Sequence, residues 1–166
     1  GDPAQFSCSF DFDNTYTPAP TAVTFEGVKT LSGVRPAALG ADEFSFSLYA
    51  TDRNWTAPGT LVETVLNADD GNGGYTAIAF SEISYDTAGD YYYLLMEDTP
   101  SNVGGVADDT HAYQIHVLVT DDSIGYLHVE SVLVDGEEKV TGDPAAFSFS
   151  FDFENIYTPA PTWITF

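Results

Sequence analysis

Three residues that can react with one another, Lys29, Glu97 and Asn155, each fall on an apolar face of a predicted β-strand. Side chains on a strand alternate between its two faces, so residues two or four apart share a face. By this rule Lys29 shares a face with Phe25, and Asn155 shares one with Phe153. Glu97 ends a row of tyrosine and leucine side chains, in a strand that is apolar on both faces. We therefore expect an amine, a carboxyl group and a carboxamide in the core.

Two interpretations of this buried trio are open from the residues alone. The first is a satisfied polar cluster, an ion pair capped by an amide, although such pairs are costly to desolvate. The second is a reaction, because burial lowers the pKa of a lysine, raises that of a glutamic acid and can leave a neutral, nucleophilic amine. Attack of Lys29 on the carboxamide of Asn155, with Glu97 transferring protons, would release ammonia and join the two side chains by an amide.

The elements that must position these residues are short β-strands. The chain contains eight runs of alternating apolar and polar residues, separated by turn sequences rich in glycine, aspartate and asparagine, and no helical period competes with them. This pattern predicts an all-β fold, an antiparallel β-sandwich of immunoglobulin-like type. The predicted strands are Val23–Leu31, Glu43–Ala50, Leu61–Leu66, Tyr75–Phe80, Asp90–Met96, Ala112–Thr120, Gly125–Val134 and Ala146–Ile156.

Residues 1–25 and 142–166 are two copies of one segment, with 19 of 25 positions identical at an offset of 141. Such a period indicates tandem repeats, and the proline-rich YTPAPT at both junctions predicts a short stiff link. We expect residues 1–20 to be the last strand and linker of a preceding repeat, residues 21–161 a complete repeat, and residues 162–166 the start of the next. The chain is therefore expected to be a piece of a longer protein.

The sequence also predicts the chemical state of two residues in the first copy. Asn14 is the equivalent of Asn155, and it should be unreacted because the lysine of its own repeat is missing, unless strands exchange between molecules. Cys8 is the only cysteine and aligns with Phe149, so we expect a small core side chain and neither a disulfide nor a zinc site.

The charge of the chain disfavours several classes of partner. Lysine and arginine total 4 against 26 aspartates and glutamates, which gives a formal net charge of −22. Such a chain repels phosphate backbones and anionic lipid surfaces, so nucleic acids and membrane surfaces are not expected as partners. These residues include no secretory signal and no apolar run long enough to cross a bilayer, so no membrane insertion is expected of this segment.

Six segments of the complete repeat carry a resemblance to a known family. They are VKTLSG around Lys29, DEFSFSLYA (42–50), LNADDGNGGYTAIAF (66–80), YDTAGDYYYLLMED around Glu97, DDTHAYQIHVLVTDDSIGYL (108–127) and FENIYTP around Asn155. The sequence resembles the streptococcal-type pilin isopeptide-linkage domains, which are CnaB-like immunoglobulin-fold repeats of Gram-positive surface adhesins and pilins. It departs from that family at GVADDT (105–110), where an aromatic residue is common.

The resemblance implies an isopeptide bond between Lys29 on the first strand and Asn155 on the last, with Glu97 on a central strand as the catalytic residue and no cofactor. It also implies a structural stalk repeat of a bacterial adhesin or pilus-like fibre, extracellular and anchored to the cell wall through regions outside these residues. The partners would be neighbouring repeats of the same chain. Beyond this single-turnover reaction on itself, the chain is not expected to be an enzyme.

The loops leave two other functions open. A host glycan or protein could bind loop 53–59, where Trp55 is expected to be exposed, or loop 97–105. Calcium could bind NADDGNGG (67–74), but this segment lacks the glutamate that completes an EF-hand loop, and its glycines suit a hairpin turn, so no metal site is expected. Ordinary surface loops are the simpler explanation in a repeated stalk unit.

Overall fold

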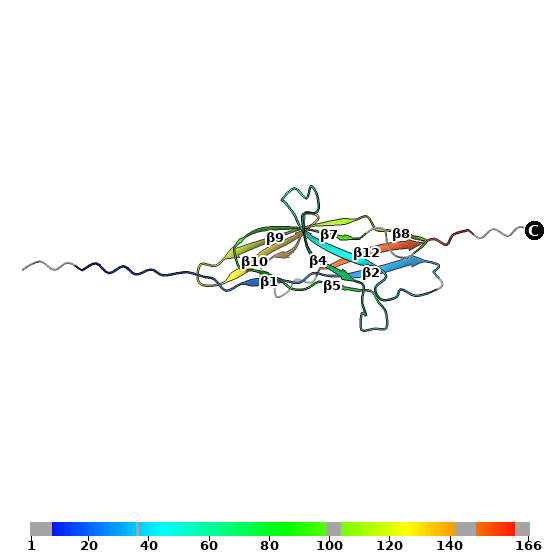
Figure 1. Cartoon of the computed structure of the whole chain (residues 1–166), viewed down its shortest axis with the longest axis horizontal. Helices are drawn as coiled ribbons and strands as arrows, with labels where there is room; N and C mark the ends of the chain where they lie inside the picture. The colour runs from blue at the N-terminus through cyan, green and yellow to red at the C-terminus, as the bar shows by residue number, and fades with distance from the viewer. Residues whose placement is uncertain (1–7, 36, 99–103, 142–148, 162–166) are drawn as a thin grey trace, which may run out of the picture.

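The computed structural model describes residues 8–35, 37–98, 104–141 and 149–161, and the regular elements in these ranges are all β-strands (Figure 1). One sheet has six strands in the order β11, β10, β9, β7, β3, β4; a second has four in the order β5, β2, β12, β8; and β1 pairs with β6. The all-β sandwich is therefore confirmed. The strands are β1 (Thr21–Val23), β2 (Glu26–Gly33), β3 (Ser45–Ala50), β4 (Thr60–Leu66), β5 (Ala77–Ala79), β6 (Ile83–Tyr85), β7 (Gly89–Glu97), β8 (Val106–Ala107), β9 (Ala112–Asp121), β10 (Leu127–Val134), β11 (Glu137–Thr141) and β12 (Ser150–Tyr157).

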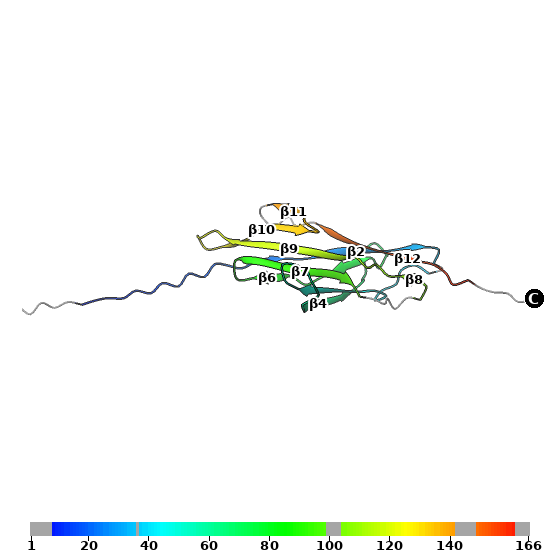
Figure 2. The same cartoon turned by 90° about the horizontal axis from the view of Figure 1, so that it is seen from above.

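Strands β2 and β12 lie side by side and run in the same direction, whereas the other paired strands of the described residues are antiparallel. Their register places Lys29 beside Phe153 and Leu31 beside Asn155. The described chain enters at one end of the long axis and leaves at the other, as both views show (Figures 1 and 2). A pull on the two ends therefore acts along β2 and β12 in shear.

The alternation that predicts the reactive trio is present on both of these strands. On β2, Gly27 and Lys29 are buried between exposed residues, and on β12, Phe151, Phe153 and Asn155 are buried between exposed residues. The rings of Phe153 and Phe46 are 4.9 Å apart between centroids and join the four-stranded sheet to the six-stranded one. The core therefore lies between the two sheets, and the inward face of β12 faces into it.

The structure differs from the expected strands in two ways. The predicted strand Val23–Leu31 is two strands, because the chain leaves its pairing with β6 after Val23 and joins β5 and β12 from Glu26 onward. Three strands were not predicted: β6, β8 and β11. They are only three, two and five residues long, and β11 begins with two glutamates, so alternation gives little signal over such lengths.

The segment before β1 lies outside the sandwich, although it copies β12. Phe10 and Phe12 are 75% and 82% exposed, whereas their equivalents Phe151 and Phe153 are fully buried. The position beside β2 is already filled by β12, so the first copy has no place in this core. The expectation that Cys8 is a core side chain is therefore wrong, and its thiol is exposed.

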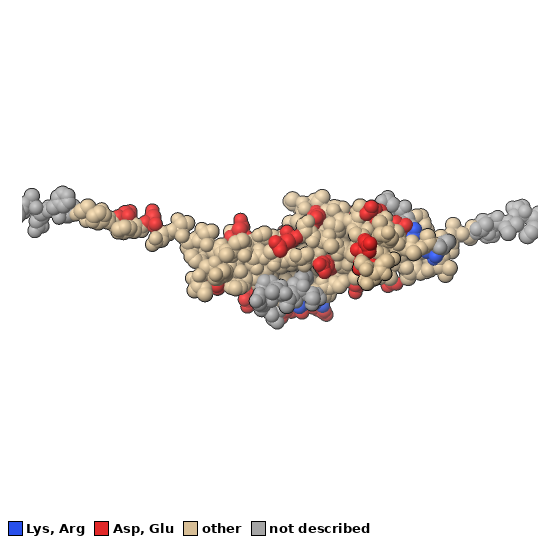
Figure 3. Space-filling view, turned by 90° about the horizontal axis from the view of Figure 1, so that it is seen from below, with Lys and Arg blue, Asp and Glu red and all other residues tan. Residues whose placement is uncertain are grey.

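The surface carries acidic side chains along the whole length of the body. On the face shown in Figure 3 the red side chains are spread over the body, and basic atoms are few. This distribution fits the formal net charge of −22. Among the described residues there is no helix with the length and apolar character needed to cross a membrane.

Candidate isopeptide site

Lys29, Glu97 and Asn155 meet in the core between the two sheets. Lys29 projects from β2 and Asn155 from the adjacent β12, while Glu97 is the last residue of β7 in the six-stranded sheet. Lys29 and Asn155 are 0% exposed and Glu97 is 4% exposed. The fold thus brings together three residues that lie far apart in the sequence, and it excludes water from them.

The carboxyl group of Glu97 contacts both of the other residues at once. Lys29 Nζ lies 2.5 Å from Glu97 Oε2, and Asn155 Nδ2 donates a hydrogen bond to Glu97 Oε1 at 2.6 Å. Each carboxyl oxygen therefore has its own partner. This arrangement holds the amine and the carboxamide next to the same acid, as proton transfer between them requires.

Aromatic rings form the wall around the amine. Lys29 Nζ lies 4.4 Å from the centroid of the Phe44 ring and 5.9 Å from that of Phe46. Both rings are buried. A ring face attracts a cation, but the rings cannot replace the hydration that an ammonium group loses on burial. The environment therefore disfavours the charged form of Lys29.

Burial moves the two ionisable groups toward their neutral forms. The pKa of Lys29 is lowered by desolvation, against the opposing effect of its hydrogen bond to Glu97. The pKa of Glu97 is raised by desolvation, against the opposing effects of its hydrogen bonds to Lys29 and Asn155. Both shifts favour a proton on the acid and a free electron pair on the amine.

Asp109 is a fourth member of the site. Its backbone N–H donates to Asn155 Oδ1 at 2.9 Å, so the carboxamide is held at both its nitrogen and its oxygen. The Asp109 side chain anchors this donor, because Oδ2 accepts from the N–H of Glu154 at 3.0 Å and Oδ1 accepts from the N–H of His111 at 2.8 Å. An N–H aimed at a carbonyl oxygen can stabilise the negative charge that develops there when a nucleophile adds to the carbon.

Only the local part of the role of Asp109 could be predicted from the sequence. An aspartate that caps the N–H two residues ahead is a common turn pattern, and Asp109 and His111 have the spacing for it. The contact with Asn155 spans 46 positions, and no local pattern indicates it. GVADDT (105–110) stood out only as a departure from the family pattern.

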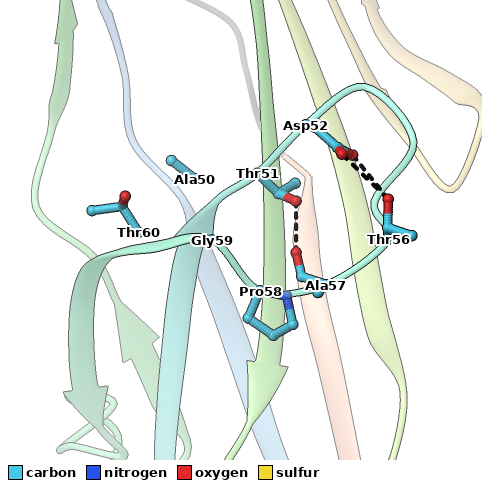
Figure 4. A pocket seen from close by; sticks show the side chains of 8 residues that line it. All are labelled: Ala50, Thr51, Asp52, Thr56, Ala57, Pro58, Gly59 and Thr60. Carbon is cyan, nitrogen blue, oxygen red and sulfur yellow. Dashed lines mark hydrogen bonds between the residues drawn. The ribbon is translucent and has the colours of Figure 1, made fainter.

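Of the two loops considered for a host ligand, loop 53–59 differs from its expectation, whereas residues 99–103 of loop 97–105 lie outside the described residues. Trp55 is half-buried, and its ring meets that of Tyr92 edge to face at 5.4 Å, so the expectation of an exposed tryptophan is wrong. Figure 4 shows a hollow in this region, lined by Ala50, Thr51, Asp52 and residues 56–60. Thr51 Oγ1 donates to the carbonyl of Ala57 at 2.7 Å across this hollow. Trp55 does not line it, and the residues that do are mostly small.

Two other residues singled out from the sequence lie away from the trio. Asn14 is exposed on the segment before β1. In NADDGNGG, Asp70 accepts hydrogen bonds from the N–H groups of Asn72 and Gly74 and from the hydroxyl of Thr76. The Asp70 carboxylate thus shapes the tip of a local hairpin closed by the antiparallel bridge between Ala68 and Ala77, whereas β4 and β5 themselves belong to different sheets.

Comparisons with known proteins agree with the fold. The sequence profile of the Spy0128-like isopeptide containing domain matches residues 25–158. A mutant of the major pilin from Streptococcus pyogenes aligns in structure with a TM-score of 0.50 and 18% identity, covering 81% of this chain and 50% of the pilin. The unmutated major pilin gives 0.48 and 19%, with the same coverage. The chain thus spans about half the length of these pilins. A comparison with curated proteins found no match.

Proposed function

This chain belongs to the family of Spy0128-like isopeptide containing domains, and we propose that it is a stalk module of a pilus or surface adhesin, closed by a covalent bond between Lys29 and Asn155. The observation that carries this proposal is the Glu97 carboxyl group, which contacts Lys29 Nζ through one oxygen and Asn155 Nδ2 through the other. In a passive polar cluster, such contacts would only satisfy the hydrogen-bonding capacity of the buried groups. The pKa shifts of Lys29 and Glu97 add the protonation state that a reaction needs.

The proposed reaction is an aminolysis of the carboxamide. The neutral amine of Lys29 attacks Cγ of Asn155, and the charge that develops on Oδ1 is stabilised by the N–H of Asp109. Glu97 gives its proton to Nδ2 and takes one from the attacking nitrogen. The bond from Cγ to Nδ2 breaks, ammonia leaves, and the new amide joins Nζ to Cγ. Glu97 ends in its original protonated state, so no cofactor or oxidant is consumed.

The proposed bond would close nearly the whole module. Lys29 and Asn155 lie on adjacent parallel strands but are 126 positions apart in the sequence. In the chain-entropy model, closing a loop of this length stabilises the folded state by roughly 5 kcal/mol. Because β2 and β12 are loaded in shear, the bond would also carry tension between the two ends. These properties support a role as a load-bearing unit.

The proposed module spans residues 21–161. The twelve strands of the described residues lie between Thr21 and Tyr157. The copies at residues 1–25 and 142–166 support neighbouring modules of the same kind as the partners. No contact in the loop around Trp55 favours a host-ligand function over the structural one.

The mass of the intact protein under denaturing conditions tests this proposal. The wild type should be lighter than its sequence by one ammonia, and a Glu97→Ala variant should have the full sequence mass. Peptide mapping of the wild type should then recover Lys29 and Asn155 in one branched peptide. A full-mass wild type that is folded by circular dichroism would reduce the trio to a buried polar cluster.

A further inference from the structure

The link before β1, residues 16–20, is held against the turn between β9 and β10. Ala19 donates its N–H to the carbonyl of Gly125 at 2.8 Å and accepts from the N–H of Leu127 at 2.9 Å. Tyr16 donates its hydroxyl to Asp121 Oδ1 at 2.7 Å. These contacts cross more than a hundred positions of sequence, so they attach the link to the body of the module.

The proline pattern of the link makes this attachment specific. Pro18 and Pro20 have no N–H and fixed φ angles, so Ala19 supplies the only backbone donor of the PAP segment. That donor is used in the bond to Gly125. The link therefore has little freedom to attach in another register.

The turn that receives the link has a fixed shape of its own. Asp122 Oδ1 accepts from the N–H groups of Ile124, Gly125 and Tyr126 at 2.8, 3.0 and 2.9 Å. Asp121 Oδ1, which receives the Tyr16 hydroxyl, also accepts from the N–H of Ser123 at 2.7 Å. Two carboxylates thus order the turn, and one of them also presents an acceptor to the link.

The equivalents of Tyr16 and Thr17 at the end of β12 are bound to the module that the chain is leaving. At the offset of 141, Tyr16 corresponds to Tyr157 and Thr17 to Thr158. Tyr157 is the last residue of β12, and Thr158 donates its N–H to the carbonyl of Gly105 at 2.8 Å. Backbone hydrogen bonds therefore hold the chain to one module as far as the threonine, and to the next module from the alanine onward. A single proline lies between these two positions.

We propose that consecutive modules are joined end to end without a flexible hinge, with the tyrosine that ends β12 of one module bonded to Asp121 of the next. The inference rests on the tandem arrangement proposed above, but it does not depend on the isopeptide bond. The threonine and alanine Cα atoms can be at most about 7 Å apart across one proline. The end of one module at Tyr157 must therefore meet the β9–β10 turn of the following module.

Two exposed apolar side chains lie on either side of this junction. Val34 is 86% exposed and follows Gly33, which is level with Tyr157 in the β2 and β12 register. Ile124 is 82% exposed and precedes Gly125, which binds the link. Contact between the Val34 end of one copy and the Ile124 end of the next would remove both from water. A second copy of this module is therefore the partner that fits both surfaces.

A two-module chain in natural register tests the inference. Cys8→Ser removes the native thiol, and Glu130→Cys in each module places one spin label on its outer face for pulsed electron paramagnetic resonance. The wild-type link should give a narrow distance distribution. Inserting four Gly/Ser residues after the link proline should roughly double its width, and Tyr157→Phe in the first copy or Ile124→Ser in the second should also broaden it. A wild-type distribution as broad as that of the insertion variant would overturn the proposal.

The mass of the same samples separates this inference from the proposed function. A broad distribution in a chain whose modules have each lost ammonia would overturn the rigid junction alone. A narrow distribution in a chain of full sequence mass would support the junction and overturn the cross-link. Thermal unfolding of each variant shows that its modules are folded before the distances are compared.

Discussion

At the scale of single residues, the site combines a buried amine and a buried acid whose neutral forms are both favoured. Desolvation causes both pKa shifts, and the hydrogen bond between Lys29 and Glu97 opposes them. Asn155 is held between Glu97 and the backbone N–H of Asp109. Each of these contacts leads to a distinct experiment.

Asp109→Ala should slow the formation of the cross-link. The variant loses the carboxylate that anchors the loop to Glu154, so the N–H that contacts Asn155 is no longer fixed. Loss of one oxyanion donor costs about 10²–10³ in rate in an enzyme, and we expect a slowing of about tenfold or more because this donor is displaced and not deleted. The fraction of newly synthesised protein that has lost ammonia, followed over time in cell-free translation, measures the rate.

Asp152→Ala is the matched control for that experiment. Asp152 lies on the exposed face of β12, so its removal changes the net charge equally without touching the site. It should form the cross-link at the wild-type rate. Equal rates for Asp109→Ala and Asp152→Ala would show that Asp109 has no part in positioning Asn155.

Lys29→Met should make stability depend on pH through Glu97. The variant cannot form the cross-link and leaves Glu97 without its amine, so burial raises the pKa of that carboxyl group with only the Asn155 hydrogen bond opposing it. A group with a raised pKa in the folded state contributes stability below its unfolded pKa of about 4.3, and this contribution is lost as pH rises. The Tm of Lys29→Met should therefore fall relative to that of Lys29→Met/Glu97→Gln as pH rises from about 4 to about 7. A constant difference in Tm would mean that Glu97 is not desolvated.

At the scale of elements, the site depends on the close approach of β2 and β12. Gly27 lies directly beside Phe151 in this pair. A Cβ at Gly27 would lie 2.6 Å from the backbone oxygen of Phe151, which is too close for any real contact. Glycine at this position therefore allows the pairing that places Lys29 near Asn155.

Gly27→Ala should weaken this strand pair and reduce the cross-linked fraction. Forcing a methyl group into a packed site costs about 1–3 kcal/mol. The cost is best measured by chemical denaturation in the Glu97→Ala background, where no cross-link hides it. Gly104→Ala serves as the comparison, because a Cβ there meets nothing within 4 Å. If both variants unfolded at the same denaturant concentration, the β2 and β12 spacing would not limit the site.

At the scale of the whole molecule, the proposed bond decides how the module responds to force. Pulled from both ends, the cross-linked chain can extend only outside Lys29 and Asn155, because the 126 positions between them are bypassed. Asn155→Ala should instead unfold with an extension on the order of 400 Å. Single-molecule force spectroscopy measures this difference. An unfolding step of that size in protein shown by mass to be cross-linked would exclude the load-bearing role.

The sequence by itself determines the class of fold and the inward direction of the three reactive residues. Alternation is a local property of each strand, so the burial of Lys29 and Asn155 follows from their phenylalanine neighbours alone. The repeat is also visible in the sequence, because two copies need no structure to be compared. The very short strands and the break after Val23 could not be predicted, because they span too few residues for an alternating pattern to be recognised.

Only the tertiary structure decided which residues meet and which copy of the repeated segment is buried. The parallel pairing of β2 with β12 and the approach of β7 from the other sheet are contacts between distant parts of the chain. They place Glu97 between its partners, bring the N–H of Asp109 to Asn155, and leave Phe10 and Phe12 exposed although their sequence matches a core strand. The physical reason is that a strand's side chains indicate which face is apolar, whereas hydrogen bonding to neighbouring strands determines where that face lies.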